Sequence, residues 1–373
     1  MREDPVQRLL TVGPARVYAG DGALGELGPA VGRVASRVAI VTGSTSWGPA
    51  SKAVEAALSS AGVAIEVLFY GEQVSESTMD RLCFEARGAD AIVGVGGGKA
   101  LDAAKLAAHR LGLPVYTVPT SAATCAAWTA LSNVYSDAGG WLYGVSLEQA
   151  PQAVFLDHGL ILDAPVRLLA AGVADAMAKW YESDSAVDLG SADATSAGAV
   201  ELGHHLHKQL VRHAKAALSG DRDAGVRVAD LNVLLTGTVS GLGGSMCRSV
   251  AAHAVANGLT HLPGTSRSLH GEKVAFGLLV QFILQDRGLA EIEEFIAFLA
   301  DLRLPLTLES LGLPDTVAGL ARAVEIAMEP DSTLHRLPVA VDALTLGRAM
   351  LEADALASRV PGAGCKALSR RPS

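Results

Sequence analysis

Short apolar runs alternate with alanine-rich segments through the first part of the chain. Five β-rich runs predict strands at residues 37–42, 64–70, 91–96, 115–119 and 153–157. Three alanine-rich segments predict helices between them, at residues 49–62, 77–87 and 99–111. This alternation is typical of an α/β domain whose parallel sheet is covered by helices on both faces.

The pattern changes after about residue 164, where long helical periodicities follow one another without a convincing strand. The predicted helices are residues 176–186, 195–218, 226–241, 249–258, 272–285 and 289–302. We therefore expect an all-α second domain and a boundary near residues 158–166. The division is 1–162 and 163–373.

Composition narrows the class of protein. Half of the 373 residues are hydrophobic and 18% are charged, which is typical of a globular protein with large cores. The net charge of −9 disfavours nucleic acid or an anionic membrane surface as a partner. Cys83, Cys125, Cys247 and Cys365 show no paired spacing. Without a signal-peptide pattern or an apolar run long enough to span a bilayer, we expect a cytoplasmic protein with reduced thiols.

The glycine run Gly96-Gly97-Gly98 lies between a predicted strand and a predicted helix. Glycines allow a backbone to approach an anionic group closely, and the N–H groups of a following helix can bind a pyrophosphate. The spacing is not G-x-G-x-x-G, and a plain strand-to-helix turn would explain the same residues. The run is a candidate phosphate-binding loop.

Three polar side chains in the helical half stand in small, apolar surroundings. They are Asp175, His253 and His270. A buried carboxylate is costly unless it is paired or binds a metal, and one Asp with two His gives the three-ligand set of a catalytic zinc site. Each also has a simpler explanation, since Asp175 fits a helix N-cap and either histidine fits a hydrogen-bonded core residue.

These motifs together resemble the iron-containing alcohol dehydrogenase and glycerol dehydrogenase superfamily. Gly96 to Lys105 resembles its G-G-G-x-x-x-D-x-x-K cofactor loop, and residues 168–176, 251–260 and 270–277 resemble its metal-aspartate and two metal-histidine segments. The resemblance implies the dehydroquinate synthase-like fold, with a nucleotide-binding domain at 1–162 and a metal-binding, substrate-binding domain at 163–373. It also implies a homo-oligomer, a nicotinamide cofactor, and a catalytic metal held by Asp175, His253 and His270.

The resemblance assigns a set of residues to the cofactor. These are Gly43, Ser44, Gly96, Gly97, Gly98, Asp102, Lys105, Thr117, Thr120, Ser121 and Thr124. Many NAD-dependent relatives have an acid after the first strand, at the place of Gly43. Its absence favours NADP(H) over NAD(H), because a 2′-phosphate is no longer repelled. A plain turn explains Gly43 and Ser44 equally well, and no arginine is evident for the phosphate.

Departures from the family pattern bear on the metal and the substrate. Lys179 occupies the position, one helical turn after Asp175, where iron-dependent members have a histidine, which favours Zn²⁺ over Fe²⁺. Cys125 replaces the aspartate of glycerol dehydrogenases, and Trp128 follows it. This pattern resembles the hydroxycarboxylate dehydrogenase subgroup, in which Arg248 would clamp a carboxylate. A surface arginine paired with an acid is the alternative for Arg248.

We therefore expect an NAD(P)-dependent, metal-dependent oxidoreductase that interconverts a small 2-oxo acid and its alcohol by hydride transfer. A glycerol or polyol dehydrogenase is the nearest alternative, and an aldehyde or imine reductase stays open. A dehydroquinate synthase-like lyase fits less well, because no dense basic cluster accompanies the metal motifs.

Overall fold

Six parallel strands form one sheet in the N-terminal half of the computed structural model, which describes residues 10–313 and 316–364. Their order is β1–β8–β5–β4–β2–β3. The strands are β1 (Arg16–Gly20), β2 (Arg37–Thr42), β3 (Ala64–Phe69), β4 (Ala91–Gly96), β5 (Val115–Pro119) and β8 (Ala153–Asp157). The five predicted strands are confirmed. The edge strand β1 escaped prediction because three of its five residues are exposed and none is fully buried.

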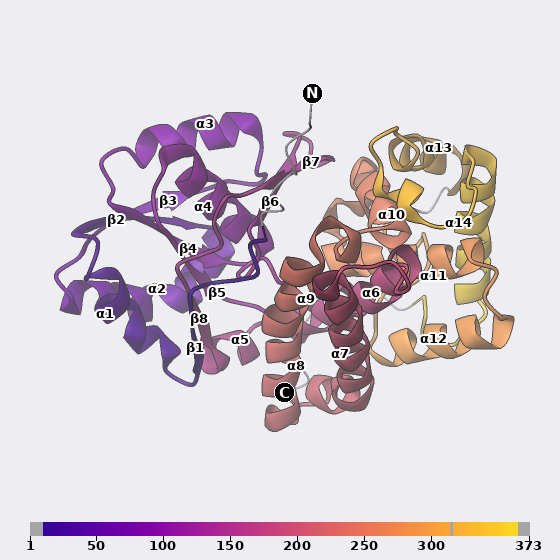
Figure 1. The fold of residues 1–373 in the computed structure, drawn as a ribbon, viewed down its shortest axis with the longest axis horizontal. Coiled ribbons are helices and arrows are strands. Elements are labelled where there is room, and N and C mark those ends of the chain that lie inside the picture. The colour runs from indigo at the N-terminus through magenta and orange to yellow at the C-terminus, as the bar shows by residue number, and fades with distance from the viewer. Residues whose placement is uncertain (1–9, 314–315, 365–373) are drawn as a thin grey trace.

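Helices cover both faces of this sheet, as predicted (Figure 1). In β2, Val38 and Ile40 join the apolar core on one face, while Ala39 and Val41 join the core on the other. An apolar run buried on both faces is the expected pattern of a central parallel strand. The helices of this half are α1 (Leu27–Val31), α2 (Ser44–Ser60), α3 (Glu76–Glu85), α4 (Gly98–Leu111) and α5 (His158–Leu162).

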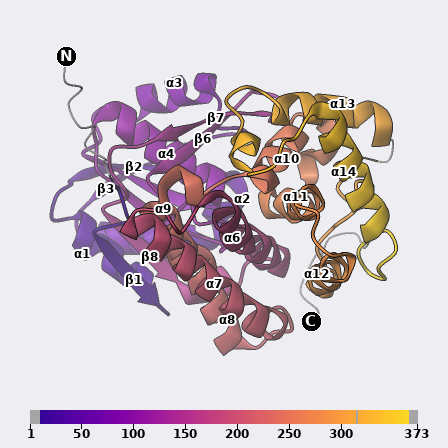
Figure 2. The same ribbon diagram turned by 45° about the vertical axis from the view of Figure 1, so that its right-hand side comes forward.

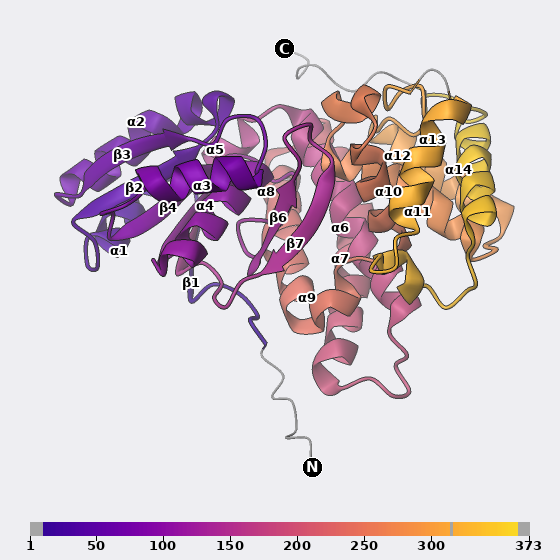
Figure 3. The same ribbon diagram turned by 90° about the horizontal axis from the view of Figure 1, so that it is seen from above.

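An antiparallel hairpin that the sequence did not predict leaves the sheet domain after β5. It consists of β6 (Leu131–Tyr135) and β7 (Trp141–Ser146). Its tip contacts the helical half, where the Trp141 backbone N–H donates to Thr260 Oγ1 at 2.8 Å and His261 Nε2 donates to the Trp141 carbonyl oxygen at 2.7 Å. Figure 3 shows the hairpin between the two halves of the molecule.

The remainder of the described chain, residues 163–313 and 316–364, is helical and contains no strand. Its helices are α6 (Val166–Ala186), α7 (Ala194–Leu218), α8 (Arg222–Asp230), α9 (Thr236–Gly243), α10 (Ala251–Thr260), α11 (His270–Leu284), α12 (Leu289–Asp301), α13 (Thr316–Ala327) and α14 (Ala343–Ala357). A π-helical turn over Leu231–Leu235 divides the predicted helix 226–241 in two. The last two helices escaped prediction. Figure 2 shows α13 and α14 packed outside α10 and α11.

Two glycines of α11 let this helix approach its neighbours closely. A β-carbon on Gly271 would lie 1.8 Å from the Ala171 carbonyl oxygen of α6, and one on Gly277 would lie 2.2 Å from the Ala252 carbonyl oxygen of α10. Any side chain at these positions would force the helices apart. The small residues therefore set the mutual positions of α6, α10 and α11.

The remaining sequence predictions concern thiols and membranes. Cys83 and Cys125 are free thiols, while Cys365 lies outside the described residues. Within the described chain, no helix combines the length and the apolar character that crossing a membrane requires.

Candidate active site

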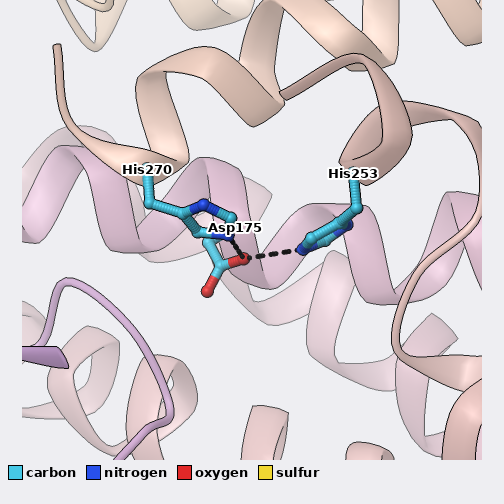
Figure 4. A group of neighbouring side chains, drawn as sticks. All are labelled: Asp175, His253 and His270. Atoms are coloured by element: carbon cyan, nitrogen blue, oxygen red, sulfur yellow. Dashed lines mark hydrogen bonds and ion pairs between the residues drawn. The ribbon is translucent and has the colours of Figure 1, made fainter. Parts of the chain in front are cut away.

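Asp175, His253 and His270 converge from the three closely packed helices α6, α10 and α11 (Figure 4). Asp175 Oδ1 lies 3.3 Å from His253 Nε2 and 3.5 Å from His270 Nε2. One donor atom from each of the three residues lies within 4.8 Å of the others. Asp175 and His253 are buried, whereas the His270 side chain is 34% exposed and faces the open side of the site.

Asp175 lies in the middle of α6, which begins at Val166 rather than at the predicted residue 176. The N-cap explanation for this aspartate is therefore wrong. Burial raises the pKa of the Asp175 carboxyl, but the Lys179 ammonium and the hydrogen bonds of His253 and His270 outweigh burial and hold it well below its usual value. The carboxylate is charged and directed at both imidazoles.

Glu182 fixes the orientation of His253 from behind. Its carboxylate accepts hydrogen bonds from the His253 Nδ1–H and from the backbone N–H groups of Val250 (2.7 Å) and His253 (3.0 Å). Burial raises the pKa of Glu182, but its interactions with His253 and Lys179 lower it below the usual value. A carboxylate that accepts from one ring nitrogen leaves the other lone pair free for a metal.

Lys179 lies one turn after Asp175 and is also buried. Its Nζ is 3.9 Å from Asp175 Oδ1 and 3.3 Å from His253 Nε2, and it donates to the Arg248 carbonyl oxygen at 2.9 Å. An ammonium group offers no lone pair to a cation. Asp175, His253 and His270 are therefore the residues that would hold a metal here, and all three line the cavity.

This donor set fits a divalent transition metal. One carboxylate oxygen and two imidazole nitrogens, with a carboxylate supporting one of the histidines, are typical of catalytic metal sites. A metal ion would also pair directly with the buried carboxylate of Asp175, because Lys179 Nζ at 3.9 Å is too distant for a full hydrogen bond.

A single cavity of about 1100 Å³ joins this triad to the sheet domain. One end is lined by Gly43, Ser46 and Tyr70, beyond the carboxyl end of β2, and the middle by Gly97 and Gly98. Ligands of parallel α/β sheets bind at this edge. The cavity therefore connects the carboxyl end of β2 with the metal ligands, as an extended cofactor requires.

The glycine run shapes the middle of the cavity. Gly96 has φ +148°, and a β-carbon there would lie 2.7 Å from the Ala100 β-carbon and 2.9 Å from Ser46 Oγ. Gly97 is the N-cap of α4, whose first N–H groups receive no side-chain cap. Those groups and the positive end of the helix dipole are available to a phosphate.

Many of the residues predicted to bind cofactor or substrate line the cavity. They are Gly43, Gly97, Gly98, Asp102, Thr120, Ser121, Thr124, Cys125 and Arg248. The others lie outside its lining, so that their contact with cofactor or substrate stays a prediction. They are Ser44, Gly96, Lys105, Thr117 and Trp128.

The side chains of Lys105, Thr117 and Trp128 have partners within the protein. The Lys105 ammonium is buried, pairs with Asp102 at 3.0 Å and donates to the carbonyl oxygens of Thr129 and Leu131. Thr117 donates to the Ala127 carbonyl oxygen at 2.8 Å. Trp128 donates to the Val12 carbonyl oxygen at 3.0 Å and packs on Gly237 of α9. These side chains hold the segment that follows β5 and do not contact the cavity.

The structure shows contacts of two acids, Asp102 and Glu182, that the sequence did not predict. Asp102 accepts from the backbone and side-chain N–H groups of Asn133 on the hairpin, at 3.1 and 3.2 Å. Glu182 was not identified at all. A signal existed, because Asp175, Lys179 and Glu182 repeat at helical spacing along an otherwise alanine-rich face.

Cys125 and Arg248 lie in the cavity near the triad. Burial raises the pKa of the Cys125 thiol to about 11, so the group is neutral at pH 7. Arg248 Nε donates to the Ser240 carbonyl oxygen at 3.4 Å. Among the described residues no acid lies within ion-pair distance of its guanidinium, so the alternative of a surface arginine paired with an acid is wrong.

Known oxidoreductases are similar in sequence to this chain over most of its length. The sequence profile described as "Iron-containing alcohol dehydrogenase" matches residues 14–158. An uncharacterized oxidoreductase of Synechocystis sp. is 40% identical over 92% of both chains. Glycerol dehydrogenase of Pseudomonas putida is 35% identical over 92% of this chain and 96% of that protein. Hydroxycarboxylate dehydrogenase A of Escherichia coli is 36% identical over 95% and 99% respectively.

Solved structures agree with the sequence relatives. The crystal structure of a probable glycerol dehydrogenase from Sinorhizobium meliloti superimposes with a TM-score of 0.85 at 30% identity. The match covers 95% of this chain and all of that one. Near-complete coverage on both sides means that the parallel sheet and the helical domain belong to one shared architecture.

Proposed function

We propose that this chain, which belongs to the iron-containing alcohol dehydrogenase family, interconverts a small 2-oxo acid and its 2-hydroxy acid. It is an NAD(P)-dependent oxidoreductase with a divalent metal at an Asp/His/His site. In the reducing direction a hydride passes from the reduced nicotinamide to the substrate carbonyl carbon, and a proton from solvent is added to the oxygen. The products are the 2-hydroxy acid and the oxidised cofactor.

The metal ligands are held before substrate arrives. A divalent metal held by Asp175, His253 and His270 supplies a Lewis acid for the substrate oxygen. Glu182 fixes the His253 ring, and the close contact of Gly271 with Ala171 fixes the position of His270. Preorganised ligands avoid reorganisation during the reaction, which is the main source of electrostatic catalysis.

We expect this metal to be zinc, since Lys179 takes the place of a fourth protein ligand. The test is to strip the protein with a chelator and reload it with Zn²⁺ or, anaerobically, with Fe²⁺. Higher turnover with zinc supports the proposal, and higher turnover with iron contradicts it.

The cofactor lies along the cavity in this proposal. The free N–H groups at the start of α4 would bind the pyrophosphate, and Thr120, Ser121 and Thr124 would line the part of the cofactor site nearer the metal ligands. At the far end Gly43 provides no carboxylate to repel a 2′-phosphate. We therefore expect NADP(H) to be preferred to NAD(H).

The observation that carries the substrate assignment is the guanidinium of Arg248. It lines the cavity and forms no ion pair with any acid of the described residues, and the backbone carbonyl of Arg248 accepts a hydrogen bond from Lys179 beside Asp175. A carboxylate on the carbon next to the reacting carbonyl would satisfy this charge with paired hydrogen bonds. By the resemblance, Cys125 takes the place of the aspartate of glycerol dehydrogenases. Its thiol is neutral, so it does not repel an anionic substrate.

Glycerol or a related polyol is the second candidate. It is favoured by the names of the relatives, among which glycerol dehydrogenase is more frequent than hydroxycarboxylate dehydrogenase. Both substrates would use the same metal ligands and cofactor loop. They differ in whether Arg248 is needed.

The deciding experiment compares 2-oxobutyrate with dihydroxyacetone as substrates for the zinc-loaded protein and for Arg248→Gln. For a 2-oxo acid reductase, kcat/KM for 2-oxobutyrate exceeds that for dihydroxyacetone, and the variant loses at least about 100-fold on the acid alone. Selective turnover of dihydroxyacetone, with little effect of the variant, assigns the protein to the polyol dehydrogenases.

A further inference from the structure

A second arginine lines the same part of the cavity as Arg248. Arg336 ends a short 3₁₀ turn (Thr333–Arg336) that packs against the segment before α10. Ser249 Oγ lies 3.0 Å from Thr333 Oγ1, which donates to the Val250 carbonyl oxygen at 2.8 Å. These contacts fix the turn that carries Arg336 to the segment that carries Arg248.

Neutral groups hold both arginines in place. Arg336 Nη1 donates to the carbonyl oxygens of Ser245 and Ser249, and Arg248 Nε donates to that of Ser240. No acid in the described chain forms an ion pair with either guanidinium. By contrast, the partly buried Arg167 pairs with Glu272, and Arg287 pairs with Glu291.

The nearby acids do not neutralise this pair. Glu182 acts on Arg336 through its charge, but its carboxylate is already bound by His253 and two backbone N–H groups. Glu329 and Asp331 also line the cavity, yet both are exposed and neither pairs with an arginine. Two positive charges therefore face one end of the cavity in a protein whose net charge is −9.

Placing two partly buried like charges together has a cost. Burial lowers the pKa of both guanidinium groups, and their mutual repulsion lowers that of Arg248 further. Arginine stays protonated all the same, so the charges persist. A ligand with two anionic groups would offset this cost, whereas a monocarboxylate would leave one charge unmatched.

We propose that Arg336 is a specificity-determining residue that binds a second anionic group of the substrate, remote from the carboxylate bound by Arg248. The substrate class is then a 2-oxo acid with a terminal carboxylate or phosphate. This inference rests on the proposed reduction of 2-oxo acids and extends it to the far end of the substrate.

The test uses pairs of substrates that share the same number of carbon atoms or the same carbon skeleton and differ in whether a second anionic group stands at the end. The carboxylate pair is 2-oxoglutarate and 2-oxopentanoate, and the phosphate pair is 3-phosphohydroxypyruvate and hydroxypyruvate. For the native enzyme we expect kcat/KM to be at least about tenfold higher for the dianionic member of one pair, mainly through KM. The pair that shows the difference identifies the anionic group.

The variant Arg336→Gln should lower kcat/KM for the dianion at least about tenfold more than for its partner, and Arg336→Lys should restore part of the difference. The matched control is Arg322→Gln, which removes an exposed arginine paired with Glu325 outside the cavity and should change neither value. Equal losses on both members of a pair would mean that Arg336 only supports the turn, and would overturn the proposal.

Inhibition of the native enzyme provides a measurement that needs no variant. Glutarate should compete with the substrate at least about tenfold more tightly than pentanoate, which lacks the second carboxylate. Equal inhibition, together with equal turnover of both members of each pair, contradicts the role of Arg336 alone. Turnover of dihydroxyacetone without any 2-oxo acid would instead refute the proposed function itself.

Discussion

Gly271 of α11 lies against Ala171 of α6 so closely that a β-carbon on the glycine would approach the alanine carbonyl oxygen to 1.8 Å. Gly271 directly follows the metal ligand His270, and Ala171 lies one helical turn before the ligand Asp175. The contact between two small residues therefore sets the distance between two ligands.

The variant Gly271→Ala should weaken metal binding. The added methyl group forces α11 away from α6, and a shift of a few tenths of an ångström is enough to spoil the ligand geometry. We expect at least about a tenfold loss of Zn²⁺ affinity in a competition with a chromogenic chelator. Gly288→Ala is the control, because a β-carbon there meets nothing within 4 Å. Native affinity in Gly271→Ala would show that the helices adjust without moving His270.

Glu182→Gln tests the group behind His253. The amide keeps the size of the carboxylate but accepts the Nδ1–H bond without a charge, so the ring is held less firmly and its other nitrogen becomes a poorer donor to the metal. Metal affinity should fall about 10- to 100-fold, with a parallel fall in activity at limiting zinc. The exposed Glu293→Gln serves as the control. An unchanged affinity would assign Glu182 a purely structural role.

Sequence reasoning succeeded where burial is continuous and failed where tertiary contacts decide. The run Arg37–Thr42 is apolar enough to identify a central strand from its letters alone. The hairpin β6–β7 is not, because its faces are only partly buried and its stability comes from contacts with α4 and Thr260. Lys105 was likewise assigned to the cofactor because of its spacing from the glycine run. In the structure its buried ammonium instead donates to a backbone carbonyl oxygen of the segment that follows β5.

The same limit applies to the candidate site. Asp175, His253 and His270 stood out because each interrupts a small apolar run. Arg336 did not stand out, because an arginine in a polar segment between two helices is common. Only the fold shows that it lies beside Arg248. The homo-oligomer implied by the resemblance stays a prediction.

His207 should make the protein less stable at mildly acidic pH. Burial, together with the charges of His204 and Lys208, lowers its pKa from 6.5 to about 4 in the folded state. Between these two values the unfolded chain binds a proton that the folded protein does not, so the free energy of unfolding falls as the pH falls through this range.

Because His207 is only partly buried, we expect this contribution to be about 1–2 kcal/mol between pH 7 and pH 4.5. His207→Gln keeps an acceptor for the Tyr181 hydroxyl but does not titrate. Urea denaturation of metal-free protein at both pH values measures the effect, with the native protein losing more stability than the variant. Identical losses would mean that His207 is protonated equally easily in the folded and unfolded states.

Gly43 should control the choice between the two nicotinamide cofactors. It lies at the start of α2 and lines the cavity with Ser46 and Tyr70, without a carboxylate or an arginine among these three. In Gly43→Asp the new charge would repel a 2′-phosphate and accept the ribose hydroxyls of NADH, so the ratio of kcat/KM for NADPH to that for NADH should fall at least about tenfold.

Any residue larger than glycine must also displace its neighbours, because a β-carbon at Gly43 lies 3.1 Å from the Tyr70 ring and 3.2 Å from Ser46 Oγ. Gly43→Asn has the same shape without the charge and therefore separates the two effects. If both variants lose the same amount with NADPH and NADH, the site discriminates by shape and the predicted preference for NADP(H) has no electrostatic basis. A fall in the NADPH to NADH ratio confined to the aspartate variant places the 2′-phosphate beside Gly43, because only a negative charge there distinguishes the two cofactors.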